Sequence, residues 1–303
     1  MECLANVPAV SSALDLERGS SGTGVATLWL DRPETRNALG AAFFDELPAA
    51  MAELSEDRAV RAIVVAARGP SFSVGLDVKE LGAFLATDAG QVGGESGERA
   101  SAERTGGQGE PLSPAARAVA TRRSVRRLQA AITAVADCPK PVVAAVHGHC
   151  IGGGMDLATA CDIRLASSDA IFSVRETRMA LVADLGVLQR LPRIVGAGHL
   201  AELAFTGKDI DARRAKEIGL VNEVYPDRDA LLHAATSLAQ EIAALSPLAV
   251  QGTKSVLAAN DGLTLAQALE YVATWNAGML ASEDLAEAVH AFFDKRPPRF
   301  TGA

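Results

Sequence analysis

The chain has few cysteines, no surplus of basic residues and no apolar run longer than a strand. Four of its 303 residues are cysteines and none forms a CxxC pair, which is typical of a protein kept in a reducing compartment. The formal net charge of -8 argues against a general nucleic-acid binder, because phosphate contacts require a basic surface. Apolar runs of strand length predict no membrane-spanning helix.

Several sequence signatures are absent as well. Residues 1–20, a loose lead-in, carry acids before the first arginine and no continuous apolar block, unlike a secretory leader, so we expect a cytoplasmic protein. There is no GxSxG nucleophile elbow, and Gly252-Thr-Lys254 lacks the rest of a phosphate-binding loop. His147 and His149 have no cysteine or carboxylate at zinc spacing, so we predict no metal site.

The N-terminal part repeats a unit of strand, loop and helix. Strands are predicted over residues 24–30 and 61–67, and the second is apolar throughout, as in strands buried on both faces. A helix over 39–54 places five apolar side chains on one face: Phe43, Phe44, Leu47, Met51 and Leu54. A glycine-containing loop over 69–81 opens a second helix.

The composition changes sharply after this unit. Residues 86–116 are rich in glycine, serine and charge, with too few large apolar groups to offset the entropy of ordering, so we predict a flexible surface insertion. A predicted helix over 115–137 follows and carries Arg117, Arg122, Arg123, Arg126 and Arg127. This arginine-rich face is either a solvated surface or a contact for the phosphates of a ligand.

The central stretch is a second strand, glycine loop and helix start. An apolar run over 141–147 leads into the glycines of 148–154 and then into a helix-forming segment that carries Asp156. Backbone N–H groups at a helix start lack partners and lie at the positive end of the helix dipole. The loop is therefore a candidate anion or oxyanion site.

Two further acids follow in apolar surroundings. Strands are predicted over 162–167 and 170–176, and alternation in the second places Glu176 on the same face as Phe172 and Val174. Asp184 comes eight residues later. A short strand is predicted over 220–224, and the chain beyond residue 226 is almost wholly helical, so we predict an α/β core over 1–225 and a helical region over 226–303.

These features resemble the crotonase family, the enoyl-CoA hydratases and isomerases. The resemblance covers nearly the whole chain and is carried by segments 137–154, 73–77, 205–207, 215–224 and 294–296. It implies a spiral of strand-strand-helix repeats with a C-terminal helical region for oligomerisation, and a homotrimer or dimer of trimers. It also implies an acyl-CoA thioester substrate and no cofactor, since coenzyme A is part of the substrate.

The resemblance also assigns binding positions. It implies an oxyanion hole made by the backbone N–H groups of Leu76 and Gly153. The substrate contacts that it implies come from Val74, Asp77, Gly152 and Lys295. Lys254 and Arg296 also fall where the family's C-terminal helices approach coenzyme A, although we favour solvated surface charge as the role of these basic residues.

The three acids point to one branch of the family. Asp156, Glu176 and Asp184 resemble the set in delta(3,5)-delta(2,4)-dienoyl-CoA isomerases, whereas hydratases have glutamate at the first position and commonly glycine at the third. Moving a 3,5-diene into 2,4-conjugation takes a proton from C2 and delivers one to C6, which suits two separated acid/base groups. We expect Glu176 to take the first proton and Asp184 to supply the second, with Asp156 tuning the pair. Ala180 departs from the glycine of these isomerases.

Simpler roles remain open for each acid. Asp156 can complement the dipole of its own helix, Asp184 can cap the next helix, and Glu176 can pair with Arg175 or Arg178. Two other functions also remain open. One is an enoyl-CoA hydratase or single-bond enoyl-CoA isomerase, and the other is a non-catalytic acyl-CoA or RNA-binding relative.

Overall fold

The computed structural model describes residues 12–20, 22–80 and 113–303. Most of the predicted insertion over 86–116 lies outside the described residues. Its last residues, 114–116, belong to α3, and the Ser113 side chain caps this helix by accepting a hydrogen bond from the Ala116 N–H. The strands are β1 (Leu14–Arg18), β2 (Val25–Leu30), β3 (Ala62–Ala67), β4 (Val142–Val146), β5 (His149–Ile151), β6 (Ile163–Ser167), β7 (Ile171–Ser173), β8 (Ile210–Asp211) and β9 (Glu223–Tyr225).

The described helices form three groups. Those around the sheets are α1 (Ala41–Glu56), α3 (Pro114–Asp137), α4 (Gly153–Ala160), α5 (Val187–Val195), α6 (Ala197–Thr206), α7 (Ala212–Glu217) and α8 (Arg228–Ala243). Two short 3-10 helices are η1 (Pro33–Thr35) and η2 (Glu176–Met179). The last three helices are α9 (Pro247–Ala259), α10 (Leu265–Met279) and α11 (Glu283–Asp294).

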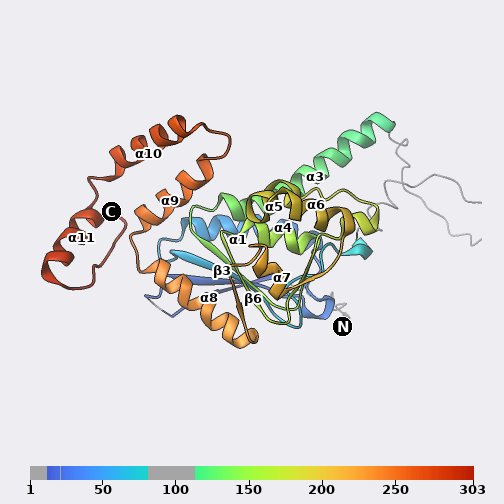
Figure 1. Ribbon diagram of the computed structural model, residues 1–303, viewed down its shortest axis with the longest axis horizontal. Coiled ribbons are helices and arrows are strands. Elements are labelled where there is room, and N and C mark those ends of the chain that lie inside the picture. The colour runs from blue at the N-terminus through green and yellow to red at the C-terminus, as the bar shows by residue number, and fades with distance from the viewer. Residues whose placement is uncertain (1–11, 21, 81–112) are drawn as a thin grey trace, which may run out of the picture.

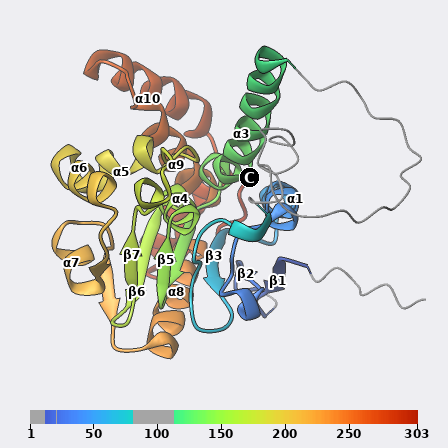
Figure 2. The same cartoon turned by 90° about the vertical axis from the view of Figure 1, so that its right-hand side faces the viewer.

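Two sheets organise the core. The larger has the strand order β1-β2-β3-β4-β6-β9, in which only the β1-β2 pair is antiparallel. The smaller has the order β5-β7-β8, and Figure 2 shows β5 and β7 side by side near α4. The smaller sheet therefore carries the glycine loop that follows β5.

Alternation along β3 divides its side chains between two apolar cores. Ile63 and Val65 face the core shared with α1 and α3, whereas Ala62, Val64 and Ala66 face α8. Every residue of β3 is buried, which confirms the prediction of a strand covered on both faces. Figure 1 shows α8 below the sheet, with α1, α4 and α5 above it.

The helix α1 confirms its predicted face. Its five buried residues are the five expected ones: Phe43, Phe44, Leu47, Met51 and Leu54. The helix α8 lies beyond the predicted division at residue 225, yet Leu231, Ala235 and Ala239 pack against the large sheet. The helices that leave the core are thus α9 to α11.

Three details of the sheets differ from the sequence prediction. Leu14–Arg18 forms an edge strand rather than a loose lead-in, held by antiparallel pairing with β2. The strand β7 ends at Ser173, so the alternation expected to orient Glu176 is wrong, and Glu176 instead begins η2. The short predicted strand over 220–224 is also displaced, to Glu223–Tyr225.

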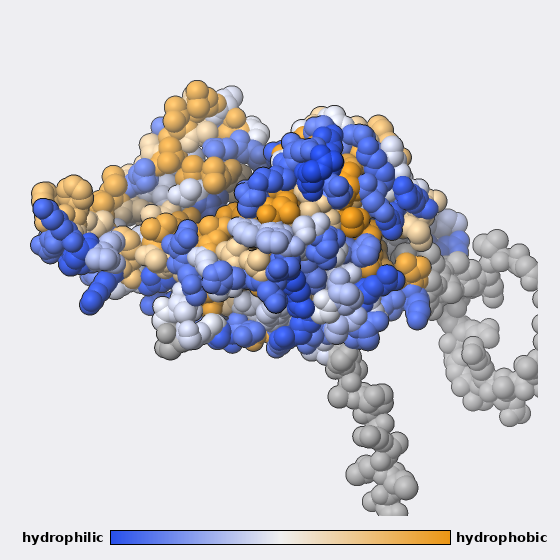
Figure 3. Space-filling model, turned by 60° about the horizontal axis from the view of Figure 1, so that its bottom comes forward, coloured by the Kyte–Doolittle hydropathy of each residue, from blue (hydrophilic) through white to orange (hydrophobic). Residues whose placement is uncertain are grey.

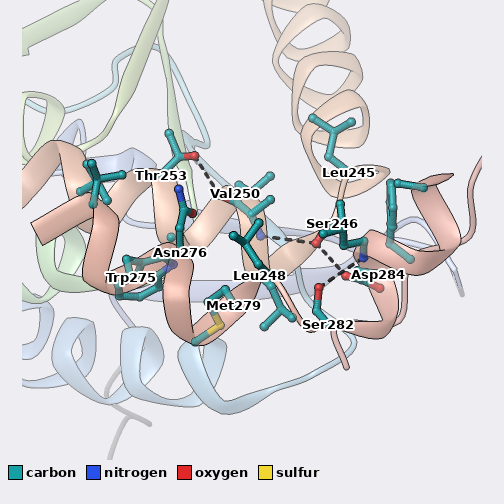
Figure 4. A pocket seen from close by; sticks show the side chains of 18 of the residues that line it. Leu245, Ser246, Leu248, Val250, Thr253, Trp275, Asn276, Met279, Ser282 and Asp284 are labelled. Atoms are coloured by element: carbon teal, nitrogen blue, oxygen red, sulfur yellow. Dashed lines mark hydrogen bonds between the residues drawn. The ribbon is translucent and has the colours of Figure 1, made fainter. Parts of the chain in front are cut away.

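The helices α9, α10 and α11 form an arm that extends from the core, as Figure 1 shows. A groove of about 730 Å³ runs between them and is lined by apolar side chains such as Leu248, Trp275 and Met279 (Figure 4). Several large apolar side chains of the arm are exposed, and Figure 3 shows apolar surface gathered there. Among the described residues no single helix meets the length and apolarity of a membrane span, although α8 and α9 do so as a pair bent by 106°.

Candidate active site

Two loops from distant parts of the chain are joined at the start of α4. Ser73 and Cys150 form a parallel bridge, the Ser73 N–H donates to the His149 carbonyl, and the Ile151 N–H donates to the Ser73 carbonyl at 3.0 Å. The Ser73 hydroxyl also donates to the Asn37 carbonyl at 2.8 Å. These contacts fix the loop over 71–77 against the loop that opens α4.

Glycine is required where these loops touch. A Cβ on Gly75, whose φ is +90°, would lie 2.9 Å from the Ile151 carbonyl oxygen, and a Cβ on Gly154 would lie 2.9 Å from the Ser73 carbonyl oxygen. Both distances are shorter than side-chain packing allows, and the positive φ of Gly75 disfavours any other residue. The glycines therefore permit a close approach of backbone to backbone.

The same approach brings the two predicted oxyanion donors together. A Cβ on Gly153 would lie 3.7 Å from the Leu76 nitrogen, and a Cβ on Gly75 would lie 3.4 Å from the Gly153 nitrogen. Among the described residues neither the Leu76 N–H nor the Gly153 N–H has a hydrogen-bond acceptor. Gly153 is the first residue of α4, where the helix dipole adds positive potential. The pair is thus available to a negatively charged oxygen.

Asp156 is the most deeply buried of the three acids, with 1% of its surface exposed. Its Oδ1 accepts a hydrogen bond of 2.7 Å from the Val187 N–H, at the start of α5, and its buried Oδ2 has no partner among the residues that the structure describes. Asp156 therefore caps a helix other than its own. Burial, the largest effect, raises the pKa of Asp156 to about 7, and the nearby Glu176 and Asp184 act in the same direction.

Glu176 reaches back to the glycine loop. Its Oε1 lies 3.4 Å from the position that a Cβ on Gly152 would occupy, and its buried Oε2 has no partner in the described part of the chain. Arg175 pairs instead with Asp209, and the Arg178 Nε donates to the Thr206 carbonyl, so the surface-pair role for Glu176 is wrong. Burial raises the pKa of Glu176, and the charge of Asp184 raises it further.

Asp184 lies on the turn that joins η2 to α5. The residue is exposed, but partial burial of its carboxyl raises the pKa of Asp184. It does not cap α5, since Gly186 holds the N-cap position and Asp156 accepts the Val187 N–H. The simple capping role expected for Asp184 is therefore wrong.

The three acids are thus close enough to interact, since Glu176 and Asp184 raise the pKa of Asp156 and Asp184 raises that of Glu176. Of the predicted binding residues, Val74 and Asp77 are half-buried on the loop that carries Leu76, and Gly152 precedes α4. Lys295 is not brought to this site, because it is an exposed residue at the end of α11, in the arm.

The remaining basic candidates have local partners. The Lys254 Nζ donates to Asp162 at 2.7 Å and ties α9 to the core, and the Arg296 guanidinium donates to Glu287 at 2.6 and 2.9 Å. On α3, Arg127 pairs with Asp45. Binding of a ligand's phosphates by the arginine-rich face of α3 stays a prediction.

Sequence reasoning missed the residues that hold the turn of Asp184. The Gln129 Nε2 donates to the Asp184 carbonyl at 2.7 Å, and the Arg190 Nη1 donates to the Leu185 carbonyl at 3.2 Å. The Arg190 Nη2 donates to the Thr133 hydroxyl at 2.9 Å. Bonds to backbone carbonyls leave no motif, so no sequence pattern marks these residues.

Among the described residues no three histidine, cysteine or acidic side chains converge as metal ligands.

Comparison with known proteins identifies the family. Residues 20–95 and 112–303 match the family model described as Enoyl-CoA hydratase/isomerase, and the chain belongs to this family of enzymes. The chain is similar to the peroxisomal delta(3,5)-delta(2,4)-dienoyl-CoA isomerase of Arabidopsis thaliana, at 42% identity over 95% of this chain and 96% of the relative. It is 40% identical to the mitochondrial human dienoyl-CoA isomerase, over 86% of this chain and 74% of the relative.

Solved structures agree on the fold. A putative enoyl-CoA hydratase from Streptomyces coelicolor A3(2) matches with a TM-score of 0.81 and 34% identity over the whole of both chains. An enoyl-CoA hydratase from Bacillus anthracis matches with a TM-score of 0.80 and 28% identity over 96% of this chain and 100% of that one. The predicted crotonase-like α/β fold is confirmed.

One prediction is overturned by these relatives. Dienoyl-CoA isomerases similar to this chain are named as peroxisomal or mitochondrial proteins, so the expectation of a cytoplasmic location is wrong. The lack of a continuous apolar block in residues 1–20 misled the prediction, because it argues only against a secretory leader.

Proposed function

We propose that this protein isomerises 3,5-dienoyl-CoA to 2,4-dienoyl-CoA by proton transfer between carboxyl groups. The observation that carries the proposal is that Glu176 reaches the glycine loop next to Gly153, and that Glu176 and Asp184 both lie close enough to the buried Asp156 to raise its pKa. The relatives named as dienoyl-CoA isomerases, at 40% to 42% identity, support the same activity.

The backbone donors stabilise the reaction intermediate. Removing a proton from C2 of an acyl thioester places negative charge on the carbonyl oxygen. The N–H groups of Leu76 and Gly153 are held by the loop pairing, so they stabilise that enolate without rearranging. Loss of one such donor in other enzymes costs about two to three orders of magnitude in rate.

The acids divide the proton transfers. Glu176, next to Gly152, takes the C2 proton in its ionised form, and Asp184 in its protonated form delivers a proton to C6. Burial raises the pKa of both acids, and the charge of Asp184 raises that of Glu176 further, which favours sharing of a proton over double ionisation. After turnover Glu176 is protonated and Asp184 is ionised, and the pair resets when Glu176 releases its proton to water and Asp184 takes one up from water.

No separate cofactor takes part in this scheme, because coenzyme A arrives with the substrate.

Assembly is a second part of the proposal. Exposed apolar side chains of the arm, including Leu265, Phe292 and Phe293, are covered by other copies of the chain in a homotrimer or dimer of trimers. No role in binding nucleic acid or membrane is part of the proposal.

A paired assay tests the activity. Purified protein is given 3,5-octadienoyl-CoA or crotonyl-CoA, and both wild type and Asp184→Asn are followed by ultraviolet absorbance. The expected result is rapid gain of the 2,4-dienoyl chromophore in wild type and its loss in Asp184→Asn. Hydration of crotonyl-CoA that is indifferent to Asp184→Asn would sink the isomerase proposal and support the hydratase alternative.

A further inference from the structure

The turn from Asp184 to Val187 is held from three other parts of the fold. Gln129 of α3 donates to the Asp184 carbonyl at 2.7 Å, and Asp156 of α4 accepts from the Val187 N–H at 2.7 Å. Between these two contacts, the Leu185 carbonyl accepts a hydrogen bond from the Arg190 Nη1 at 3.2 Å. Each bond goes to the backbone of the turn, so together they fix the position of Asp184 while leaving its carboxyl free.

Arg190 links this turn to α3. Its Nη2 donates to the Thr133 hydroxyl at 2.9 Å, while its Nη1 reaches the Leu185 carbonyl. A guanidinium has two donor arms in a fixed plane, so binding one arm to α3 orients the other toward the turn. Gly186, with φ of +120°, leaves the necessary room, because a Cβ there would lie 2.0 Å from Nη1.

We propose that Arg190 is a positioning residue that holds the turn of Asp184 at its working distance from Glu176 and supplies a positive charge facing Asp156. This inference deepens the proposed isomerase function and rests on it. The charged and titratable groups that face Asp156 are Glu176, Asp184 and Arg190, and those that face Arg190 are Asp156, Asp137 and Cys161.

The charge of Arg190 acts on the pKa of Asp156. It lowers the pKa of Asp156, against the larger upward effect of burial. Its removal therefore raises the pKa of Asp156.

The test compares Arg190→Gln with Arg193→Gln, which removes the same charge from the same helix. Arg193 is exposed and pairs with Asp261 at the surface. We expect Arg190→Gln to lower kcat by about 10- to 100-fold, because a small displacement of a catalytic group costs rates of this order. We expect KM to change by less than about threefold, since Arg190 touches no substrate. In Arg193→Gln both constants stay within about twofold of wild type.

A rescue variant separates positioning from the loss of charge. Arg190→Lys keeps the charge but lacks the two-armed geometry, so it recovers only part of kcat. Thr133→Val, a milder change that removes one acceptor, lowers kcat by about two- to tenfold and serves if Arg190→Gln does not fold.

Hydrogen exchange reads the turn without any substrate. The Val187 amide exchanges faster in Arg190→Gln than in Arg193→Gln or wild type if Arg190 holds the turn. Equal kcat in Arg190→Gln and wild type, or an unchanged exchange rate at Val187, overturns the proposal. If wild type converts no 3,5-dienoyl-CoA, the proposed function fails separately, and exchange at Val187 still decides whether Arg190 holds the turn.

Discussion

The start of α4 and the arm bury their apolar surface to opposite extents. All eight residues of α4 are buried, whereas α10, which the structure describes completely, has no buried residue. Phe292 and Phe293 of α11 are 79% and 76% exposed. One chain alone can therefore order the donors and acids of the candidate site, while the arm presents the kind of surface that marks an interaction with another molecule. The proposed chemistry and the proposed assembly therefore belong to different regions of the chain.

The largest expected effect tests whether the chemistry belongs to the α4 region. Glu176→Gln keeps the size of the side chain but removes the base, so isomerisation of 3,5-octadienoyl-CoA falls by about two to four orders of magnitude in kcat. The matched control is Glu241→Gln on α8, an exposed position outside the site, which leaves kcat near the wild-type value. Comparable rates for the two variants would remove Glu176 from the mechanism.

The next test of the same region concerns Gly75, where the two loops approach each other closely. Gly75→Ala places a Cβ 2.9 Å from the Ile151 carbonyl oxygen at a φ of +90°, so the loop must shift and move the Leu76 N–H. We expect kcat to fall by about two orders of magnitude or more, as for loss of an oxyanion donor. Gly198→Ala is the control, since a Cβ there meets nothing within 4 Å. Stopped-flow rates for both variants at equal protein concentration make the measurement.

The arm is tested through its aromatic side chains. Replacing Phe292 and Phe293 together by serine removes apolar surface that the single chain leaves exposed. If copies of the chain cover this surface, analytical ultracentrifugation shows a shift from the trimer toward the mass of one chain. The double variant Glu283→Gln and Glu287→Gln on the same helix serves as the comparison for nonspecific changes. Wild type that sediments as one chain contradicts the assembly proposal.

A smaller effect concerns the buried Asp156. Its pKa rises from 3.8 to about 7, so the folded state binds its proton more tightly than the unfolded state. Stability is therefore lost as pH rises from about 4 to about 7, by an amount on the order of 2–4 kcal/mol in all. Asp156→Asn can still accept the Val187 N–H and avoids burying a charge.

Denaturant titrations at two pH values check this sign. The free energy of unfolding of Asp156→Asn exceeds that of wild type at pH 8, and the advantage shrinks at pH 5. A larger advantage at pH 5 than at pH 8 contradicts the direction given for the pKa of Asp156.

The smallest expected effect is at Ala180, which lies between Glu176 and Asp184 in the sequence. Ala180 has a φ of +57° and ends η2, where its N–H donates to the carbonyls of Glu176 and Thr177. A left-handed conformation costs alanine more than glycine, so Ala180→Gly raises the free energy of unfolding by about 0.5–1 kcal/mol. In Ala197→Gly, the corresponding change at the start of α6, no gain is expected. Thermal unfolding of both variants measures the difference.

Local patterns predicted the parts of this molecule that depend on local sequence. The face of α1 and the buried strand β3 follow from periodicity, and Ala180 was singled out as a departure from glycine before its left-handed backbone was seen. The edge strand Leu14–Arg18 escaped notice, because it is ordered by pairing with β2 rather than by an apolar pattern of its own.

The sequence suggested which residues form the candidate site, but it did not predict how their side chains are oriented or held. Alternation placed Glu176 on a strand that ends at Ser173, so its orientation depends on η2 and not on a pleat. Asp156 was recognised, but its cap on α5 requires two helices to pack, which no local window reveals. Arg190 was missed for the same reason, since its partners are a distant hydroxyl and a carbonyl group.

The bridge between Ser73 and Cys150 also bears on how the protein folds. The Leu76 and Gly153 donors approach only when strands far apart in sequence have paired, and such long-range closure is the slow part of folding. On refolding from denaturant, helical signal should return before isomerase activity. The delay between the return of the helical signal and the return of activity would measure how slowly the two loops join.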